Sequence, residues 1–253
     1  MTEAQHKHEL LLVWKHPLSR QRYLIGRLWL DGSSFVFQSE TNQPRSLDEA
    51  VAHGFRLLGA FPSASDTYRS SELFATFYRR AFPAGLQESQ GILSQLPPDI
   101  KAFEFLRQTG GRLSTDTLEF LEPIRVQLDQ VEQYRFVFPI AGWRYCQGDK
   151  VLGELHEGTP LSLQPDTGNP YDPYAIKVLS PSGAHIGFVP SIYSWYLEEI
   201  VNADSYTAVV HEVNRGRDPD LRVRVDFRGS APIRGYRSVP SGFNRYAEEL
   251  LTK

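Results

Sequence analysis

An Asp-Gly turn between two alternating segments is the feature that most constrains the fold of this chain. In residues 10–40, apolar side chains recur at every second position on both sides of Asp31-Gly32. A period of two places side chains on one face of an extended strand, and Asp-Gly favours a tight hairpin turn. The pattern predicts a β-meander of about three strands. Its apolar positions are Tyr23, Ile25, Leu28, Leu30, Phe35 and Phe37.

Helical signals follow the meander in three segments. Ser46 is followed by Glu49 in a capping-box pattern, which predicts a short helix. Residues 70–82 and 97–111 both carry apolar side chains at helical spacing, and Gly110 is a typical helix stop. These segments predict a mixed domain of β-meander and helices over residues 10–125.

A second, β-rich domain is predicted over residues 133–229. Short strand-like segments alternate with turns, a helix is expected from the cap-type Ser191, and two long strands close the domain. This order is typical of a small OB-like β-barrel with one or two helices. The fold class of the whole chain is therefore α+β. Residues 230–253 are expected to form a tail with a short amphipathic helix.

Composition limits where and with what the protein acts. The chain has 253 residues and 41% hydrophobic content, enough to bury real cores. It has one cysteine, no signal pattern near its start and no apolar run of bilayer length. A cytoplasmic protein without a membrane segment is expected. The net charge of −3 gives no general attraction to nucleic acid.

Catalytic and metal-binding patterns are missing from the sequence. It contains no nucleotide-binding loop, serine-hydrolase elbow, zinc-protease motif or kinase set. His6 and His8 are a terminal pair and a poor metal site, and the neighbours of Cys146 supply no base to activate its thiol. We therefore expect no enzyme activity, no cofactor and no metal.

Three linked motifs in the second domain resemble the HIRAN domain family. They are GWRYCQG at residues 142–148, NPYDPYAIKV at residues 169–178 and GAHIGFVP at residues 183–190. HIRAN domains are compact β-barrels related to OB-folds, and those of helicase-like remodelling enzymes bind single-stranded DNA and hold its free 3′ end. The resemblance implies that Arg144, Tyr145, Tyr171 and Asp172 contact DNA.

The implied roles agree with ordinary side-chain chemistry. An aromatic ring stacks on any base, an arginine pairs with phosphate, and a carboxylate accepts a hydrogen bond from a terminal hydroxyl. Phe188 stands where the end-binding family members carry a histidine, and phenylalanine stacks but cannot bind phosphate. From residue 134 to residue 229, twelve acidic residues face nine basic ones, so general affinity for polyanions would be weak.

One basic strand face is predicted near the end of the second domain. In LRVRVDFRG, residues 221–229, the polar side chains alternate with apolar ones. The face is either a solvated outer surface or a track for the DNA backbone. Its basic members are Arg222, Arg224 and Arg228.

The NPYDPY turn also allows a purely structural interpretation. Asparagine and aspartate support Asx-turns and proline fixes φ, so Tyr171 could cover the end of the domain and Asp172 could cap the turn. The residues alone leave both interpretations open.

Residues 10–125 resemble, in the order of their segments, the N-terminal lobe of HipA-type toxin kinases. The likeness rests on segments 23–40, 54–80 and 103–123, and no kinase body follows them. It implies a bacterial, non-catalytic interaction module; the alternative is a supporting α+β domain. Two functions are thus expected. One is a protein that binds single-stranded DNA or a DNA 3′ end, and the other is an antitoxin-like or regulatory partner of a toxin kinase or nuclease.

Overall fold

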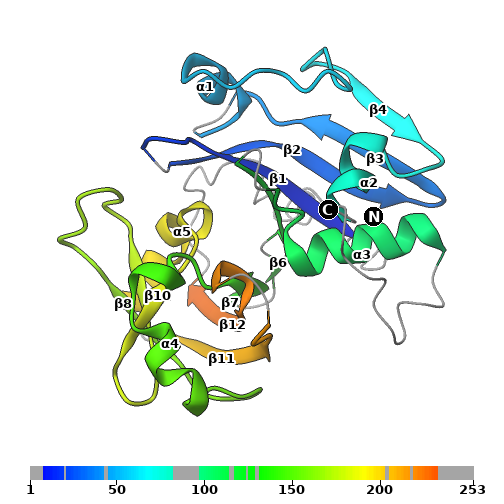
Figure 1. Ribbon diagram of the computed structural model, residues 1–253. Helices are drawn as coiled ribbons and strands as arrows, with labels where there is room; N and C mark the ends of the chain where they lie inside the picture. The colour runs from blue at the N-terminus through cyan, green and yellow to red at the C-terminus, as the bar shows by residue number, and fades with distance from the viewer. Residues whose placement is uncertain are drawn as a thin grey trace. The chain divides into compact units, whose positions relative to one another are not determined.

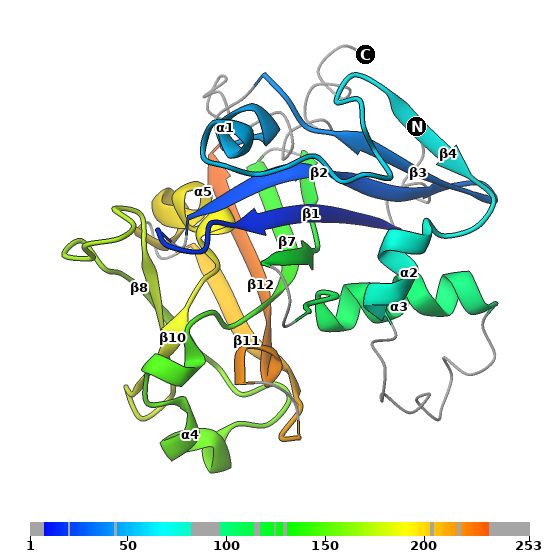
Figure 2. The ribbon, with the colours of Figure 1, turned by 45° about the horizontal axis from the view of Figure 1, so that its top comes forward.

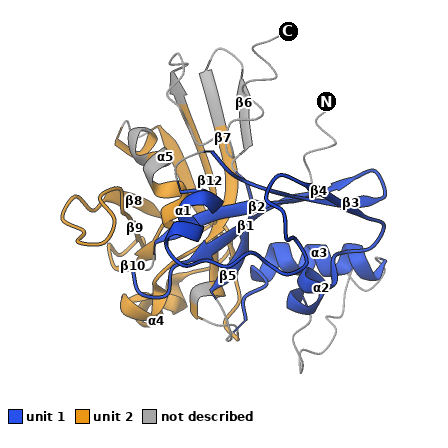
Figure 3. Cartoon of the chain, turned by 90° about the horizontal axis from the view of Figure 1, so that it is seen from above, with its two compact units in different colours: residues 1–123 blue, residues 124–253 orange. Residues whose placement is uncertain are grey.

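The computed structural model describes residues 8–19, 21–42, 45–81, 97–113, 117–123, 125–128, 131–202, 205–216 and 219–232. The chain divides into two compact units, residues 1–123 and residues 124–253 (Figure 3). We call residues 1–123 the N-terminal unit and residues 124–253 the C-terminal unit.

A five-stranded antiparallel sheet of order β4-β3-β2-β1-β5 forms the framework of the N-terminal unit (Figure 1). The predicted three-stranded meander is confirmed: β2 and β3 pair from Asp31 and Ser34 outward, and Gly32 adopts a φ of +61° in the turn. The strands are β1 (Glu9–Lys15), β2 (Arg22–Asp31), β3 (Ser34–Ser39), β4 (Thr67–Ser70) and β5 (Leu118–Leu121).

The helices of the N-terminal unit are α1 (Leu47–Ala52), α2 (Ala75–Ala81) and α3 (Pro98–Thr109). Gly110 ends α3 as predicted, with a φ of +71° and its N–H bonded to the Leu106 carbonyl. The capping box predicted at Ser46 is wrong, because Ser46 makes no side-chain cap hydrogen bond to α1. Its backbone forms a β-bridge with Leu24 instead, and its side chain is buried.

Apolar side chains from one face of this sheet pack with α2 and α3 into an aromatic core. The rings of Phe37, Phe61 and Phe77 have centroids 4.2–5.3 Å apart, and all three side chains are buried. Alternation along β3 turns Phe37 toward the helices, where it meets Phe77 of α2 and Phe61 of the segment before β4. This core is the main source of stability for the unit.

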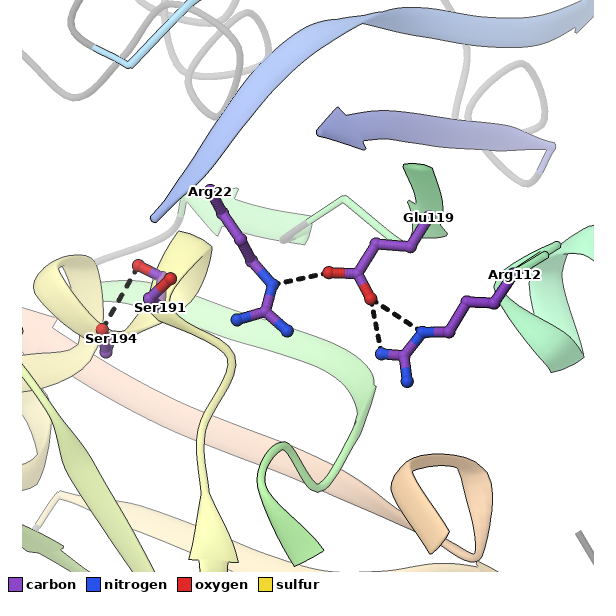
Figure 4. Close-up of polar contacts among 5 residues, drawn as sticks. All are labelled: Arg22, Arg112, Glu119, Ser191 and Ser194. Carbon is purple, nitrogen blue, oxygen red and sulfur yellow. Dashed lines mark hydrogen bonds and ion pairs between the residues drawn. The ribbon is translucent and has the colours of Figure 1, made fainter. Parts of the chain in front are cut away.

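Buried ion pairs lie on the strands of the same sheet. Arg22 donates to Glu119 Oε1 over 2.5 Å, and Arg112 Nε and Nη2 donate to Oε2 over 2.8 and 2.5 Å (Figure 4). Burial raises the pKa of the Glu119 carboxyl, but Arg112 and Arg22 together lower it more, so the pKa lies far below its ordinary range. Glu119 is therefore ionised at neutral pH.

Two antiparallel sheets build the C-terminal unit, of order β11-β12-β7-β6 and β10-β9-β8. The strands are β6 (Arg125–Leu128), β7 (Val131–Pro139), β8 (Ser162–Pro165), β9 (Ile176–Leu179), β10 (His185–Phe188), β11 (Tyr206–Val213) and β12 (Val223–Pro232). The α-helices are α4 (Gly148–Val151) and α5 (Ser191–Asn202), and the 3-10 turns are η3 (Trp143–Tyr145), η4 (Leu152–Glu154) and η5 (Pro219–Leu221).

Helix α5 contacts both sheets of the C-terminal unit, at β8 and at β12 (Figure 2). Its buried Tyr193 lies 4.7 Å from the ring of Phe136, which lies 5.3 Å from that of Phe227. The four-stranded sheet and this helix thus share an aromatic core, as expected for strands that present every second residue inward.

The α+β class predicted for the chain agrees with this mixture of helices and sheets, but the OB-like barrel is not confirmed, because the sheets do not close. β11 meets the segment before β8 in an isolated bridge between Pro160 and Val209, and Ala141 meets β10 in another. The bridge at Pro160 is made by its neighbours: the Leu161 N–H donates to the Ala208 carbonyl and the Val210 N–H to the Thr159 carbonyl, each over 2.8 Å.

The predicted tail falls mostly outside the described residues. β12 continues past Gly229 to Pro232, and the short helix expected near the C-terminus lies in residues 233–253, which are not described.

Candidate nucleic-acid interface

The turn that carries Arg144 and Tyr145 is fastened to β10 at both ends. Ala141 and Phe188 exchange two backbone hydrogen bonds of 2.8 Å each, and the Gln147 N–H donates to the His185 carbonyl over 2.8 Å. The residues between these points project from the strand edge. Arg144 and Tyr145 are consequently exposed on a turn whose two ends are fixed.

A buried tryptophan anchors this turn from inside. Trp143 is 1% exposed, and its indole Nε1–H donates to Asp149 Oδ1 over 2.8 Å. A Cβ on Gly148 would lie 2.3 Å from the Trp143 ring, and Gly142 adopts a φ of +72°. The close packing at Gly148 and the positive φ of Gly142 thus explain why the GWRYCQG motif has glycine at both positions. Tyr145 lies on the outside of this turn, with 83% of its surface exposed.

The second turn, residues 166–175, is closed by its own asparagine. Asn169 Oδ1 accepts hydrogen bonds from the Tyr171 and Asp172 N–H groups over 3.0 and 3.1 Å, and the Asp166 N–H donates to the Ala175 carbonyl over 2.7 Å. This is the Asx-turn geometry that the sequence indicated. It holds Tyr171 at the tip, where the side chain is 85% exposed.

Asp172 is tied into the protein through both carboxylate oxygens. Oδ1 accepts from the Tyr174 N–H over 3.0 Å, and Oδ2 lies 3.2 Å from the hydroxyl of the buried Ser194. The same hydroxyl lies 3.2 Å from the Ser191 carbonyl oxygen in α5 (Figure 4). Asp172 therefore caps the turn, as the structural interpretation of the NPYDPY motif predicted.

Both turns start from the same end of the three-stranded sheet. In the β9–β10 ladder Phe188 is opposite Lys177, one residue after the start of β9, and the first turn leaves from the Phe188 bridge. The second turn joins the end of β8 to the start of β9, where Pro165 is opposite Ile176. The first turn therefore begins at the sheet end where the second turn lies, and it runs along β10 to its bond with His185 at the other end of the strand.

A histidine that the sequence analysis did not single out lies beside Phe188. The rings of His185 and Phe188 are 4.7 Å apart and nearly perpendicular, and His185 Nε2 is 3.0 Å from the Gly187 carbonyl oxygen. Burial is the main cause that lowers the pKa of His185; Lys177 adds to it, and the carbonyl and Asp166 oppose it. The imidazole is therefore neutral at pH 7. The short distance between the His185 and Phe188 rings depends on the β-bulge before Gly187. The alternation of apolar and polar residues in the sequence does not reveal that bulge.

Cys146 Sγ lies 3.7 Å from His185 Nε2. Burial raises the pKa of the Cys146 thiol above its ordinary value, although Lys177 opposes the shift. A protonated thiol is a poor nucleophile, so this pair does not form an activated cysteine.

The predicted arginine face is divided by the structure into buried and exposed members. Arg222 Nη1 is bonded to Asp149 Oδ1, and only 17% of its side chain is exposed. Arg224 is 5% exposed and lies 3.8 Å from Glu212 on β11. The expectation of a uniformly solvated face is therefore wrong at Arg224, because it lies against the carboxylate of the neighbouring strand.

Arg228 is the exposed member of this face. Its side chain is 59% exposed, and Nη2 donates to Asp226 Oδ2 over 2.9 Å. Asp226 raises the pKa of Arg228, so the guanidinium is cationic throughout the physiological range.

The described residues contain no group of three or more histidine, cysteine, aspartate or glutamate side chains placed to hold a metal ion. Among the helices in the described part of the chain, none is long and apolar enough to cross a bilayer. His6, half of the terminal pair considered above, lies outside the described residues.

The three sequence motifs thus lie in a fold of two open sheets and a helix, in which two fixed turns each present an exposed tyrosine. The model of the HIRAN domain, a DNA-binding domain family, matches residues 133–231 of this chain. The match lies within the C-terminal unit, and the likeness of residues 10–125 to HipA-type kinases stays a prediction.

Solved structures were also compared with the chain. A crystal structure of a protein from Lactobacillus plantarum is 17% identical, with a TM-score of 0.33, and covers 39% of this chain and 97% of its own. The crystal structure of the HIRAN domain of human HLTF is 22% identical, with a TM-score of 0.29, and covers 38% and 75%. An NMR structure of the HLTF HIRAN domain is 18% identical, with a TM-score of 0.26, and covers 46% and 86%. No curated protein matches.

Proposed function

We propose that the C-terminal unit binds single-stranded DNA through its two tyrosine-bearing turns, and that it holds a 3′ end at the second of them. The observation that carries this proposal is the pair of tyrosines, Tyr145 and Tyr171, each more than four-fifths exposed on a turn fixed by hydrogen bonds. The family match of residues 133–231 supports the choice of DNA as ligand.

Exposed aromatic rings on fixed turns suit single strands, whose bases are free to stack. Each stacked base contributes about 1–3 kcal/mol whatever its identity. Arg144 is exposed beside Tyr145 and supplies a charge for phosphate. The binding is local, because the net charge of the chain is −3 and provides no general attraction.

The 3′ end is assigned to Asp172. Each of its carboxylate oxygens keeps a second lone pair beside the bonds to Tyr174 and Ser194, so it can accept a hydrogen bond from a terminal hydroxyl. A 3′-phosphate would bring negative charge against the carboxylate and should be rejected. Phe188 contributes ring surface and no phosphate contact. The role we propose for the chain is binding without catalysis.

Fluorescence anisotropy with labelled oligonucleotides tests this function. Single strands ending in a 3′-hydroxyl should bind more tightly than those ending in a 3′-phosphate. Tyr145→Ala and Tyr171→Ala should each weaken binding by about 1–3 kcal/mol. Leu18→Ala is the control, since Leu18 is 87% exposed in the N-terminal unit and has no part in the site. Failure of the unaltered protein to bind any strand, together with a stoichiometric protein partner from the native host, would favour the interaction role instead.

A further inference from the structure

Two exposed arginines face each other across neighbouring strands of the four-stranded sheet. Arg228 of β12 is directly opposite Arg135 of β7, and their side chains are 59% and 65% exposed. The register places Arg125 of β6 on the other side of Arg135. Three adjacent strands thus carry arginine at one level of the sheet.

Like charges directly opposite each other in a sheet destabilise it unless an anion lies between them. Asp226 supplies one carboxylate for the pair: its Oδ2 lies 2.9 Å from Arg228 Nη2 and 3.7 Å from Arg135 Nη2. Within the described part of the chain, Asp226 Oδ1 has no hydrogen-bond partner, so a single oxygen serves both guanidiniums. One positive charge of the two is left uncompensated.

The remaining donors fit an oxyanion. Each guanidinium carries five N–H donors in a planar fork, and the single carboxylate oxygen occupies few of them. Planar forks suit the tetrahedral oxygens of a phosphodiester, which they bind in a bidentate way. Asp226 is 8% exposed, whereas the side chains of Arg135 and Arg228 are 65% and 59% exposed, so most of each guanidinium side chain is open to solvent.

The arginine pair is connected to the tyrosine turns along β12. Arg222 is bonded to Asp149, which also accepts the hydrogen bond of Trp143 at the first turn. Arg228 follows six residues later on the same face, about 20 Å along an extended strand. Single-strand sites on domains of OB type cover about 4–16 nucleotides, enough to reach from the turns to the pair.

We propose that Arg135 and Arg228 together bind a phosphodiester group of the strand whose bases stack on Tyr145 and Tyr171. This inference rests on the function proposed above and adds a second contact at a distance from the strand end. It also differs from the arginine track predicted from the sequence, because Arg224 is buried and Arg135 of the neighbouring strand takes part.

Salt dependence of DNA binding measures this contact. Arg135→Gln, Arg228→Gln and the double variant are titrated with a single-stranded oligonucleotide of about 12 nucleotides at several salt concentrations. Loss of one phosphate contact should lower the slope of log K against log salt by about 0.7. At low salt the double variant should bind several-fold more weakly, by the same extent for different base sequences.

Two further variants separate lost charge from lost folding. Arg69→Gln is the matched control: Arg69 is 57% exposed and pairs with Asp31 over 2.8 Å, but faces no second arginine. It should leave the slope unchanged. The Arg135→Lys/Arg228→Lys variant keeps both charges and should retain most of the slope.

The possible outcomes separate this inference from the proposed function. If the glutamine variants keep the slope and affinity of the unaltered protein while Tyr171→Ala binds weakly, the arginine contact is overturned and the function stands. If the unaltered protein binds no strand, both are overturned. A reduced slope in the glutamine variants, with unchanged melting temperature and an unchanged Arg69→Gln control, supports the contact.

Discussion

The Ser194 hydroxyl in α5 lies 3.2 Å from Asp172 Oδ2 and thereby ties the helix to the loop that presents Tyr171. Ser194 is fully buried, and Asp172 is half-buried. Hydrogen bonds to charged groups contribute about 1.5–3 kcal/mol. The position of the tyrosine therefore depends on a helix that makes no predicted contact with DNA.

Ser194→Ala should lower the free energy of unfolding by about 1–3 kcal/mol and weaken DNA binding by loosening the Tyr171 turn. Urea denaturation measures the first effect and anisotropy the second. Ser182→Ala is the control, because the Ser182 hydroxyl also donates to a carboxylate, Glu154 Oε2 over 2.9 Å, but at an exposed position. That change should stay within about 0.5 kcal/mol. Equal effects of the two variants would contradict the assignment.

Gly148→Ala should disrupt the turn that carries Tyr145. The added Cβ would lie 2.3 Å from the buried Trp143 ring, so the ring or the α4 backbone must shift. Overpacking of this kind costs about 1–3 kcal/mol. Gly153→Ala provides the comparison, since nothing lies within 4 Å of its added Cβ. Thermal melting should show a lower midpoint for the first variant only.

Acid should destabilise the N-terminal unit through Glu119. The folded-state pKa of this carboxyl lies far below the ordinary value of about 4.3 because Arg112 and Arg22 outweigh burial. A depressed carboxyl pKa gives stability that is present above the unfolded pKa and is lost as pH falls through and below it. Urea unfolding of the full chain at pH 6, 4 and 3 should show this loss.

Glu119→Gln isolates the contribution of this residue from other carboxyl groups. Removing one partner leaves two arginines without their buried anion, which costs about 3–5 kcal/mol at neutral pH. The variant should also lose less stability between pH 6 and pH 3 than the unaltered protein. A pH dependence equal to that of the unaltered protein would show that Glu119 is not the responsible group.

Local patterns predicted the parts of this protein that depend on local physics. The Asp31-Gly32 hairpin, the αL stop at Gly110 and the Asx-turn at Asn169 each follow from a few neighbouring residues. Ser46 failed as a capping box because a β-bridge to Leu24 competes for its backbone. Local signals are reliable where no partner distant in the sequence intervenes.

The pairing of Arg135 with Arg228 shows what the sequence could not reveal. The alternation in β12 was visible, but the register against β7 is set by the packing of the whole sheet. The same limit hid the burial of Arg224 against Glu212, which depends on the ladder between β11 and β12. Whether the two sheets close into a barrel also depends on contacts between distant segments, such as the bridge at Pro160.

His185 should titrate below the ordinary histidine range, and DNA binding should not strengthen between pH 8 and pH 6.5. Burial is the main cause of the lowered pKa, so the imidazole stays neutral where an ordinary histidine of pKa about 6.5 begins to charge. The unfolded chain takes up the proton first, so the stability contributed by His185 falls as pH drops through about 6.5 toward the folded pKa. NMR titration of the histidine ring protons measures the midpoint directly. A His185 midpoint at or above the ordinary value of about 6.5 would contradict the prediction. His185→Gln should remove the corresponding loss of stability in urea unfolding between pH 7 and pH 5.5.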